Sequence, residues 1–414
     1  MKLKVIAFIF ILLANTLHAQ TSEQYSFQVL GLYGNILKHT QHLKELVKGP
    51  VMGSEIEVEW QTMGEYPWQR HLNFPIIGIG SAWLNLSNPE KLGNAFAIYP
   101  YISIPLWRTK YFNLYVKGGM GASFLSKTYY NTNQKADSTY YPSLPGTNAA
   151  IGSVLNIYFA GGGVVDIPLK NGFSLTAKYT WNHASNGSAV VPNSGINMLN
   201  GLIGIKYFPN YKTYKDPEKK QIAEIQKKIS VELIAAGGFR QLYYKDNYLN
   251  SVPSGTPDFK TFPTASLVLG MYRPITNYYR MGLGVDAFFD GVYDGHNTEF
   301  KRTFLTTNEF KNKIRVGISW QHELLMGRMT AGFHFGLYLY NPLKNLEPYT
   351  DAETSVLNKP IIYPYDIEKE DGWLYTRAAL KYSITKHYFI SLGLKTHLQK
   401  AEFIEWGLGY RFNP

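Results

Sequence analysis

The stretch Met329–Tyr340, MTAGFHFGLYLY, alternates between two kinds of side chain along its length. One set is apolar: Ala331, Phe333, Phe335, Leu337 and Leu339. The other set is small or polar: Thr330, Gly332, His334, Gly336 and Tyr338. Because successive side chains of an extended strand point to opposite faces, the stretch predicts a strand with one apolar face and one small or polar face.

The same alternation recurs in NLYVKGGMGASFL (113–125), FSLTAKYTWNH (173–183), YFISLGLKTHL (388–398) and FIEWGLGYRF (403–412). Short connections near Arg108, Asn171, Gly327 and Lys386 alternate with long polar ones. The long connections cover residues 36–53, 125–149, 241–261, 292–309 and 342–370. Outer-membrane barrels combine apolar-out, polar-in strands with tight periplasmic turns and long outer loops. The sequence therefore predicts an all-β, antiparallel outer-membrane β-barrel.

The composition agrees with this prediction. The chain has 32 Tyr, 23 Phe and 8 Trp, which suits the aromatic girdles at both interfaces of a membrane barrel. Its formal net charge of +11 suits an anionic lipid surface. The sequence contains no basic cluster and no recognition helix, so this charge does not indicate a nucleic-acid partner. The absence of cysteine excludes a lipoprotein anchor, disulfides and thiolate metal sites.

The N-terminus indicates export. Lys2 and Lys4 precede a short apolar run, Val5–Ala14, and Ala19 precedes a plausible cleavage point, so residues 1–19 are interpreted as a cleaved signal peptide. No later apolar run reaches the roughly 18 residues of a transmembrane helix. The expected location is the outer membrane of a Gram-negative bacterium.

The chain divides near its middle. About eight strands are expected between Ser26 and Phe208, and eight more between Lys228 and Phe412. Between them, YKDPEKKQIAEIQKK has an N-cap and a first-turn proline, so residues 211–228 are expected to form a periplasmic helical linker. Residues 20–210 and 229–414 would then be two tandem eight-stranded units, although one sixteen-stranded barrel fits the pattern nearly as well.

Polar side chains continue the apolar face of one strand. In FSLTAKYTWNHAS (173–185), His183 and Ser185 follow Tyr179 and Trp181 in the same parity, and Asn197 starts the outward face of the next strand. The three side chains should therefore meet outside the barrel, at the level of the outer lipid headgroups. Ser185 needs an adjacent base to act as a nucleophile, His183 would be that base, and Asn197 would orient the imidazole.

The segment that follows supplies candidate oxyanion donors. Asn186 and Gly187 add an amide side chain and flexible backbone N–H groups directly after the serine. A site on the lipid face of a barrel can serve only a lipid. The residues thus predict a lipid esterase with no metal ligand in its site.

The segment HASNGSAVVPNSGIN (183–197) resembles the active-site hairpin of the PagL-type lipid A 3-O-deacylases, which are eight-stranded outer-membrane esterases. The matching residues are His183, Ser185, Asn186, Pro192, Asn193, Gly195 and Ile196; Asn197 stands where that family has glutamate. The resemblance implies that Ser185 is the nucleophile, His183 the base and Asn197 the orienting group, with Asn186 and Asn193 as oxyanion or substrate contacts. The whole chain resembles the larger two-part acyloxyacyl hydrolase-like proteins.

Two alternatives remain open. Outer-membrane phospholipase A, a twelve-stranded calcium-dependent enzyme, has a serine–histidine–asparagine triad, and its His-x-Ser-Asn-Gly segment resembles residues 183–187. A non-catalytic binding or structural barrel is the other. The deacylase interpretation expects lipid A or lipopolysaccharide as substrate and no cofactor, whereas the phospholipase interpretation expects calcium.

Other polar residues are interpreted as structural. His39 and His42 are expected in a solvated outer loop, and His397 is expected inside the second unit, where no serine accompanies it. Lys178, Lys206 and Arg411 are expected to pair with Glu405 and other acids in the barrel interior.

Overall fold

The computed structural model describes residues 24–132, 146, 148–213, 217, 228–244, 258–293, 310–341, 373–397 and 400–412. The predicted signal peptide (1–19) and most of the predicted helical linker (211–228) lie outside these residues. No helix in the described ranges is long and apolar enough to cross a membrane.

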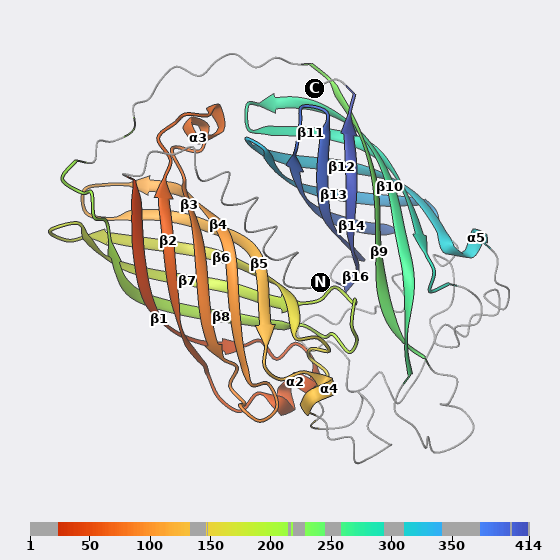
Figure 1. Cartoon of the computed structure of the whole chain (residues 1–414), viewed down its shortest axis with the longest axis horizontal. Helices are drawn as coiled ribbons and strands as arrows, with labels where there is room; N and C mark the ends of the chain where they lie inside the picture. The colour runs from red at the N-terminus through yellow and green to blue at the C-terminus, as the bar shows by residue number, and fades with distance from the viewer. Residues whose placement is uncertain are drawn as a thin grey trace.

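The described chain forms two closed antiparallel barrels of eight strands each (Figure 1). The first barrel consists of β1 (Tyr25–Ile36), β2 (Val51–Gln61), β3 (Ile76–Asn85), β4 (Asn94–Arg108), β5 (Asn113–Leu125), β6 (Leu155–Pro168), β7 (Phe173–Ser185) and β8 (Ile196–Tyr207). The second consists of β9 (Ser230–Tyr244), β10 (Asp258–Thr276), β11 (Tyr279–Asp290), β12 (Ile314–Met326), β13 (Met329–Tyr340), β14 (Leu374–Ser383), β15 (Tyr388–His397) and β16 (Lys400–Arg411).

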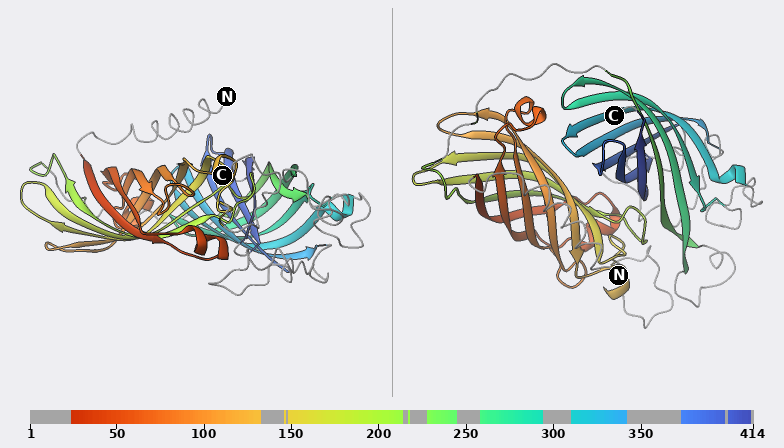
Figure 2. Two further views of the ribbon diagram at one scale, coloured as in Figure 1. Left: turned by 90° about the horizontal axis from the view of Figure 1, so that it is seen from below. Right: turned by 45° about the horizontal axis from the view of Figure 1, so that its top comes forward.

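Strand pairing decides between the two architectures that the sequence left open. β8 pairs with β1, and β16 pairs with β9, so each set of eight strands closes on itself. The prediction of tandem eight-stranded units is confirmed, and the single sixteen-stranded alternative is wrong. Figure 2 shows the two barrels side by side from two further directions.

Short helices lie in the connections between strands. They are α2 (Gln41–Leu46), α3 (Pro67–His71), α4 (Tyr129–Thr132) and α5 (Phe310–Lys313). In the first barrel, α2 and α4 lie at the end with the long loops and α3 lies at the opposite end (Figure 1). We call the long-loop end the outer rim and the other end the periplasmic rim, following the loop asymmetry of outer-membrane barrels.

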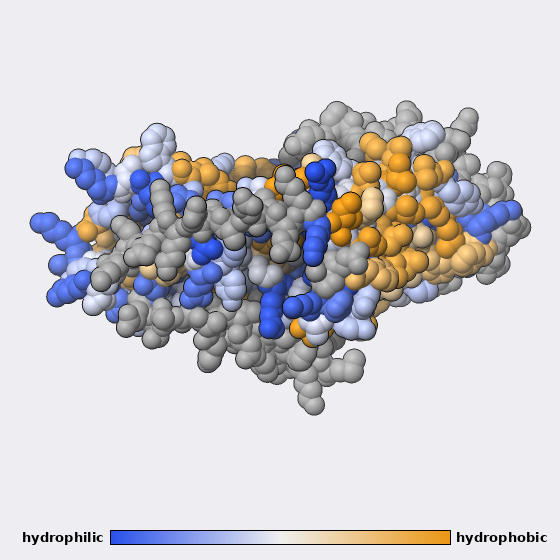
Figure 3. Space-filling model, turned by 90° about the horizontal axis from the view of Figure 1, so that it is seen from above, coloured by the Kyte–Doolittle hydropathy of each residue, from blue (hydrophilic) through white to orange (hydrophobic). Residues whose placement is uncertain are grey.

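Side chains alternate between the lumen and the surface, as the sequence pattern predicts. On β7, Tyr179 and Trp181 are exposed on the outer surface, whereas Lys178, Thr180 and Asn182 are buried in the lumen. Exposed Val29, Tyr33, Ile203, Leu283 and Trp406 belong to the same kind of outward row on other strands. Figure 3 shows a broad apolar surface over the second barrel, as expected for a barrel in contact with lipid chains.

Buried ion pairs fill the interior of the first barrel. Lys117 and Lys178 both contact Glu55 at 3.4 Å, and both also pair more closely with Glu57. The Tyr101 hydroxyl donates a hydrogen bond of 2.7 Å to Glu57. Such a network satisfies the buried charges and leaves a packed interior, in keeping with the size of an eight-stranded barrel.

The second barrel has a similar network, which corrects one detail of the sequence interpretation. Glu232 accepts from Lys381 at 2.8 Å and from Arg411 at 2.7 Å. Glu405 pairs with Arg377, so its predicted role as a partner of Lys178, Lys206 or Arg411 is wrong. The prediction that these three cations pair with interior acids is confirmed: Lys178 pairs with Glu57, Lys206 with Glu59 and Asp166, and Arg411 with Glu232. The partner could not be identified from sequence because the register between strands decides which buried charges meet.

Replacing Glu57 with alanine should strongly destabilise the first barrel. Glu57→Ala leaves two buried ammonium groups with only Glu55 nearby, and breaking a buried ion pair costs about 3–5 kcal/mol. The free energy of unfolding in detergent, measured by urea titration, should fall by that amount. Glu90→Ala is the matched control, because Glu90 is exposed and its removal should change stability by less than about 0.5 kcal/mol. Equal effects of the two substitutions would contradict the prediction.

Candidate active site

The outer ends of β7 and β8 bring His183, Ser185 and Asn197 together. His183 lies directly opposite Asn197 in the β7–β8 ladder. Ser185 is two residues beyond His183 and therefore shares its face of the strand. All three side chains continue the outward rows of their strands, as the sequence parity predicts, and they stand just beyond exposed Trp181.

Two hydrogen bonds connect the three side chains in a line. His183 Nε2 lies 2.8 Å from Ser185 Oγ, and His183 Nδ1 lies 2.8 Å from Asn197 Oδ1. Because the amide oxygen of Asn197 can only accept, Nδ1 must carry the proton and donate it. The lone pair of Nε2 then faces the serine hydroxyl, which is the arrangement in which a histidine can remove a serine proton.

Packing holds the imidazole in place. The Trp181 ring stacks on the His183 ring at a centroid distance of 5.7 Å. The ring of Phe159, on the neighbouring strand β6, lies 6.2 Å from the His183 ring. Gly195 has a φ of +74°, and a Cβ at this position would lie 2.9 Å from His183 Cε1. Glycine is therefore required where the chain passes over the ring.

His39 extends the hydrogen-bonded line, which corrects its assignment to a solvated loop. The ring is half-buried, its Nε2 lies 3.0 Å from the Ser194 carbonyl oxygen, and its Nδ1 lies 3.4 Å from Asn197 Nδ2. Nδ1 also lies 3.1 Å from the Leu37 carbonyl oxygen, which accepts from it when Nδ1 carries a proton. In the tautomer with the proton on Nε2, Nδ1 instead accepts from the Asn197 amide. That contact would fix the amide with its oxygen toward His183. Sequence reasoning missed this role because His39 is 158 residues away from Asn197 in the chain.

The connection between β7 and β8, residues 186–195, is named the site loop below. The Asn186 side-chain amide donates to Ser153 Oγ and to the Val190 carbonyl oxygen, both at 2.8 Å, so it is directed into the loop. The backbone N–H of Asn186 donates to Asn193 Oδ1 at 3.2 Å. Asn193 thus acts as an acceptor in this arrangement, although donor roles were expected for Asn186 and Asn193.

Gly187 remains as a candidate oxyanion donor. It follows directly after Asn186 with a φ of +60°, and no acceptor in the described part of the chain contacts its backbone N–H. A free backbone N–H two residues after a nucleophile is the type of donor that stabilises an oxyanion.

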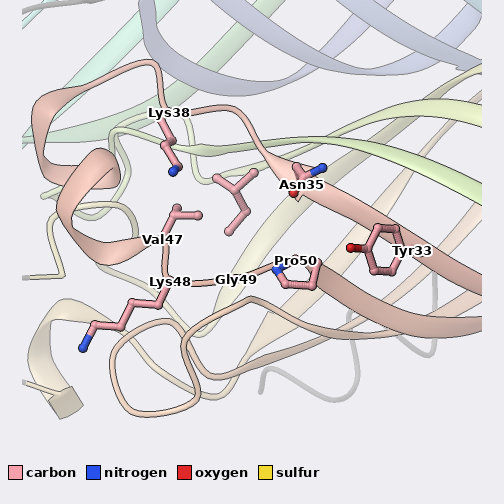
Figure 4. A pocket seen from close by; sticks show the side chains of 8 residues that line it. Tyr33, Asn35, Lys38, Val47, Lys48, Gly49 and Pro50 are labelled. Carbon is pink, nitrogen blue, oxygen red and sulfur yellow. The ribbon is translucent and has the colours of Figure 1, made fainter.

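A hollow lies at the outer rim of the first barrel (Figure 4). It has a volume of about 500 Å³, and its lining includes Tyr33, Asn35, Lys38 and Pro50. Lys38 points into it in the close-up view. The lining comes from the outer end of β1 and from the chain that leads into β2.

The second barrel repeats the topology without repeating the site. At the corresponding hairpin, Lys395 and Glu402 form a buried ion pair in the interior. The side chain of His397, predicted to be lumenal, lies outside the described residues. Within the described ranges, no group of three or more His, Asp or Glu side chains is arranged to hold a metal ion.

Comparison with known families matches both halves of the chain. Residues 54–206 match the model of the lipid A 3-O-deacylases (PagL). Residues 229–350 and 355–414 match the C-terminal domain of the acyloxyacyl hydrolases. No curated protein matches the sequence significantly.

Several solved outer-membrane proteins are similar to the chain. The crystal structure of the outer membrane enzyme PagL has 14% identity and a TM-score of 0.26, with 43% of this chain and 97% of that chain covered. A mutant of the Rh. blastica porin has 8% identity and a TM-score of 0.17, with coverages of 94% and 99%. The siderophore receptor PirA from Acinetobacter baumannii has 7% identity and a TM-score of 0.25, with coverages of 91% and 43%.

The hydrogen-bonded line predicts a graded loss of serine reactivity. An alkyl fluorophosphonate should label Ser185. In Asn197→Leu, labelling should be about a hundredfold slower, because no acceptor then holds the proton on His183 Nδ1. His39→Phe should slow it about fivefold, since only the orientation of the Asn197 amide is lost. The rate constant of labelling is followed by mass spectrometry.

His322→Phe is the matched control for these variants. His322 is also a half-buried histidine on an outer barrel face, but it contacts Tyr279 at 2.6 Å, in the second barrel. Its replacement should leave the labelling rate unchanged. Equal rates for the His39 and His322 variants would show that His39 does not orient Asn197.

Proposed function

Since the chain belongs to the family of PagL-type lipid A 3-O-deacylases and acyloxyacyl hydrolases, we propose that it is a serine esterase that removes an ester-linked acyl chain from lipid A. Family membership and the barrel fold place the protein in the outer membrane. The observation that supports the serine mechanism is the line of two 2.8 Å hydrogen bonds from Ser185 through His183 to Asn197.

The proposed reaction uses these groups in sequence. Ser185 Oγ attacks the ester carbonyl carbon while His183 Nε2 takes the hydroxyl proton, and the Gly187 N–H stabilises the oxyanion. Collapse of the intermediate expels the sugar alkoxide, which takes the proton from His183. A water molecule, deprotonated by His183, then attacks the carbonyl carbon of the acyl-enzyme. Ser185 Oγ leaves and takes that proton back from His183, and a fatty acid is released. No cofactor takes part in this scheme.

The position of the site supports a lipid substrate. His183, which is half-buried, and Ser185, which is only 8% exposed, continue the outward face of β7 above an apolar row that includes exposed Trp181 and Tyr179. An acyl chain in the outer leaflet would contact that row while its ester reached the serine. Lys38, which points into the hollow between the end of β1 and the start of β2, would attract a negatively charged headgroup at the outer rim.

Removal of Ser185 should abolish deacylation. The purified protein and its Ser185→Ala variant would be incubated with lipid A in detergent and a chelator, and the lipid would be analysed by mass spectrometry. The wild type should remove one acyl mass, and the variant should lose activity by roughly a thousandfold or more. Ser174→Ala is the matched control on the opposite, lumenal face of β7. Acyl release that persists in Ser185→Ala would show that Ser185 is not the nucleophile.

A second candidate function is calcium-dependent phospholipase A activity, favoured by asparagine at position 197. It would be supported by cleavage of glycerophospholipids that stops when the chelator is added. A protein that cleaves neither lipid with or without calcium would favour the non-catalytic barrel.

A carboxylate at position 197 should raise the rate of deacylation. In Asn197→Asp, the oxygen opposite His183 Nδ1 is kept, and its negative charge stabilises the imidazolium that forms during the reaction. We expect kcat/KM on lipid A to rise about tenfold, equivalent to about 1.4 kcal/mol of transition-state stabilisation. Asn182→Asp, a lumenal change on β7, is the control and should produce no gain. A lower kcat/KM for Asn197→Asp would indicate that the amide's contact with His39 matters more than the charge.

A further inference from the structure

We propose that the second barrel clamps the site loop of the first barrel, and that Gln241 on β9 is a positioning residue for catalysis. The catalytic part of this inference rests on the proposed function. The clamp itself rests on contacts between the two barrels at the outer rim.

Three hydrogen bonds join the site loop to the second barrel. The backbone N–H of Val191 donates to Gln241 Oε1 at 3.3 Å, and the backbone N–H of Gln241 donates to the Ser188 carbonyl oxygen at 2.8 Å. Ser188 Oγ donates to the carbonyl oxygen of Ala401, on β16, at 3.1 Å. The loop is therefore bound by the outer ends of β9 and β16, the two strands whose pairing closes the second barrel.

Apolar packing accompanies these hydrogen bonds at Gly187. A Cβ on Gly187 would lie 2.6 Å from Ile404 Cγ1 and 3.2 Å from Leu394 Cδ1, so the backbone of the loop presses against β15 and β16. Gly187 is buried although it belongs to a surface loop of the first barrel. The second barrel thus contacts the residue whose N–H is the candidate oxyanion donor.

The Gln241 side chain is itself oriented. Its Nε2 donates to Thr261 Oγ1 at 3.0 Å, and Thr261 lies opposite Gln241 in the β9–β10 ladder. Because the amide nitrogen is engaged there, the amide oxygen faces Val191. The contact is therefore made by a group that the second barrel holds in one orientation.

The first barrel holds the same segment from the other direction. The hydroxyl of Tyr130, in α4, donates to the Val191 carbonyl oxygen at 2.9 Å. A tyrosine hydroxyl stays protonated at neutral pH, so it remains a donor there. Val191 is consequently bound through both of its backbone polar groups, with its N–H bound by the second barrel.

A separate contact joins the barrels at the periplasmic rim. The ring of His71, in α3, lies 5.2 Å from the ring of Tyr278, in the turn between β10 and β11. A Cβ on Gly327, in the turn between β12 and β13, would lie 3.7 Å from Trp68 Nε1. Like ends of the barrels therefore meet at both rims, which restricts how one can tilt against the other.

The clamp has a direct consequence for catalysis. A ten-residue connection at a barrel rim is ordinarily among the more mobile parts of a protein, and an oxyanion donor is effective only when it is held in place before the reaction. Attachment to a second folded unit provides this preorganisation. The second barrel, which lacks the serine–histidine pair, would act by holding the loop.

The kinetic test compares Gln241→Leu with Gln241→Glu in the full-length protein. Leucine removes the acceptor for the Val191 N–H, so kcat on lipid A should fall about tenfold with KM changed less than about twofold. Glutamate keeps an acceptor oxygen and should retain kcat within about threefold. The rate of fluorophosphonate labelling of Ser185 should follow kcat. Full activity of Gln241→Leu, or equal losses in both variants, would overturn the positioning role.

The docking test does not depend on activity. The chain contains no cysteine, so Ser188→Cys and Ala401→Cys can be combined as the only thiols. Mild oxidation in detergent should form a disulfide, detected in proteolytic peptides by mass spectrometry. The control pair Ser188→Cys with Leu283→Cys should not form one, because Leu283 is exposed on β11, away from β9 and β16. Absence of the first disulfide would overturn the clamp.

The two tests separate failure of the inference from failure of the proposed function. If the wild type does not deacylate lipid A, the proposed function is wrong, while disulfide formation and the labelling rates still decide whether the clamp exists and acts on Ser185. If the wild type is active and the Gln241 variants behave alike, the function stands and the positioning role of Gln241 is wrong.

Discussion

Every backbone N–H and C=O that crosses the hydrocarbon layer must find a partner within the protein, because lipid chains offer none. Two closed hydrogen-bond ladders meet this requirement. The first is closed by the pairing of β1 with β8, and the second by the pairing of β9 with β16. Closure forces alternate side chains outward and inward. It thereby creates the apolar exterior and the charged interior at the same time.

The interior and the outer rim use polar residues for different purposes. In the lumen, Glu55, Glu57, Lys117 and Lys178 satisfy one another, so these charges are structural. At the outer rim, His183 and Ser185 belong to the outward row, where polar groups are expensive unless they have partners. Their partners are each other, Asn197 and, through Asn197, His39. A polar line on a lipid-facing surface is accordingly the feature that distinguishes the first barrel from a purely structural one.

The second barrel is built on the same ladder constraint with a different outcome. Its corresponding hairpin has a buried Lys395–Glu402 pair in place of a nucleophile and base. Instead, the outer ends of its strands β9 and β16 contact the site loop through Gln241 and Ala401. Duplication of a small barrel can thus separate two tasks, with one unit presenting the reactive groups and the other holding the loop beside them.

The sequence by itself determined the strands, their parity and the face on which Ser185 lies, because a period of two residues is a local property of an extended chain. The local motif also placed His183 beside Ser185, and Asn197 could be located because a hairpin joins its strand to that of His183. Only the tertiary structure decided that there are two barrels, since alternation is identical in one large barrel and two small ones. It also decided the contacts of His39 and Gln241 with the site and the pairing of Glu405 with Arg377. These depend on strand register, barrel closure and the docking of distant segments, and such long-range relations leave no periodic trace in a single sequence.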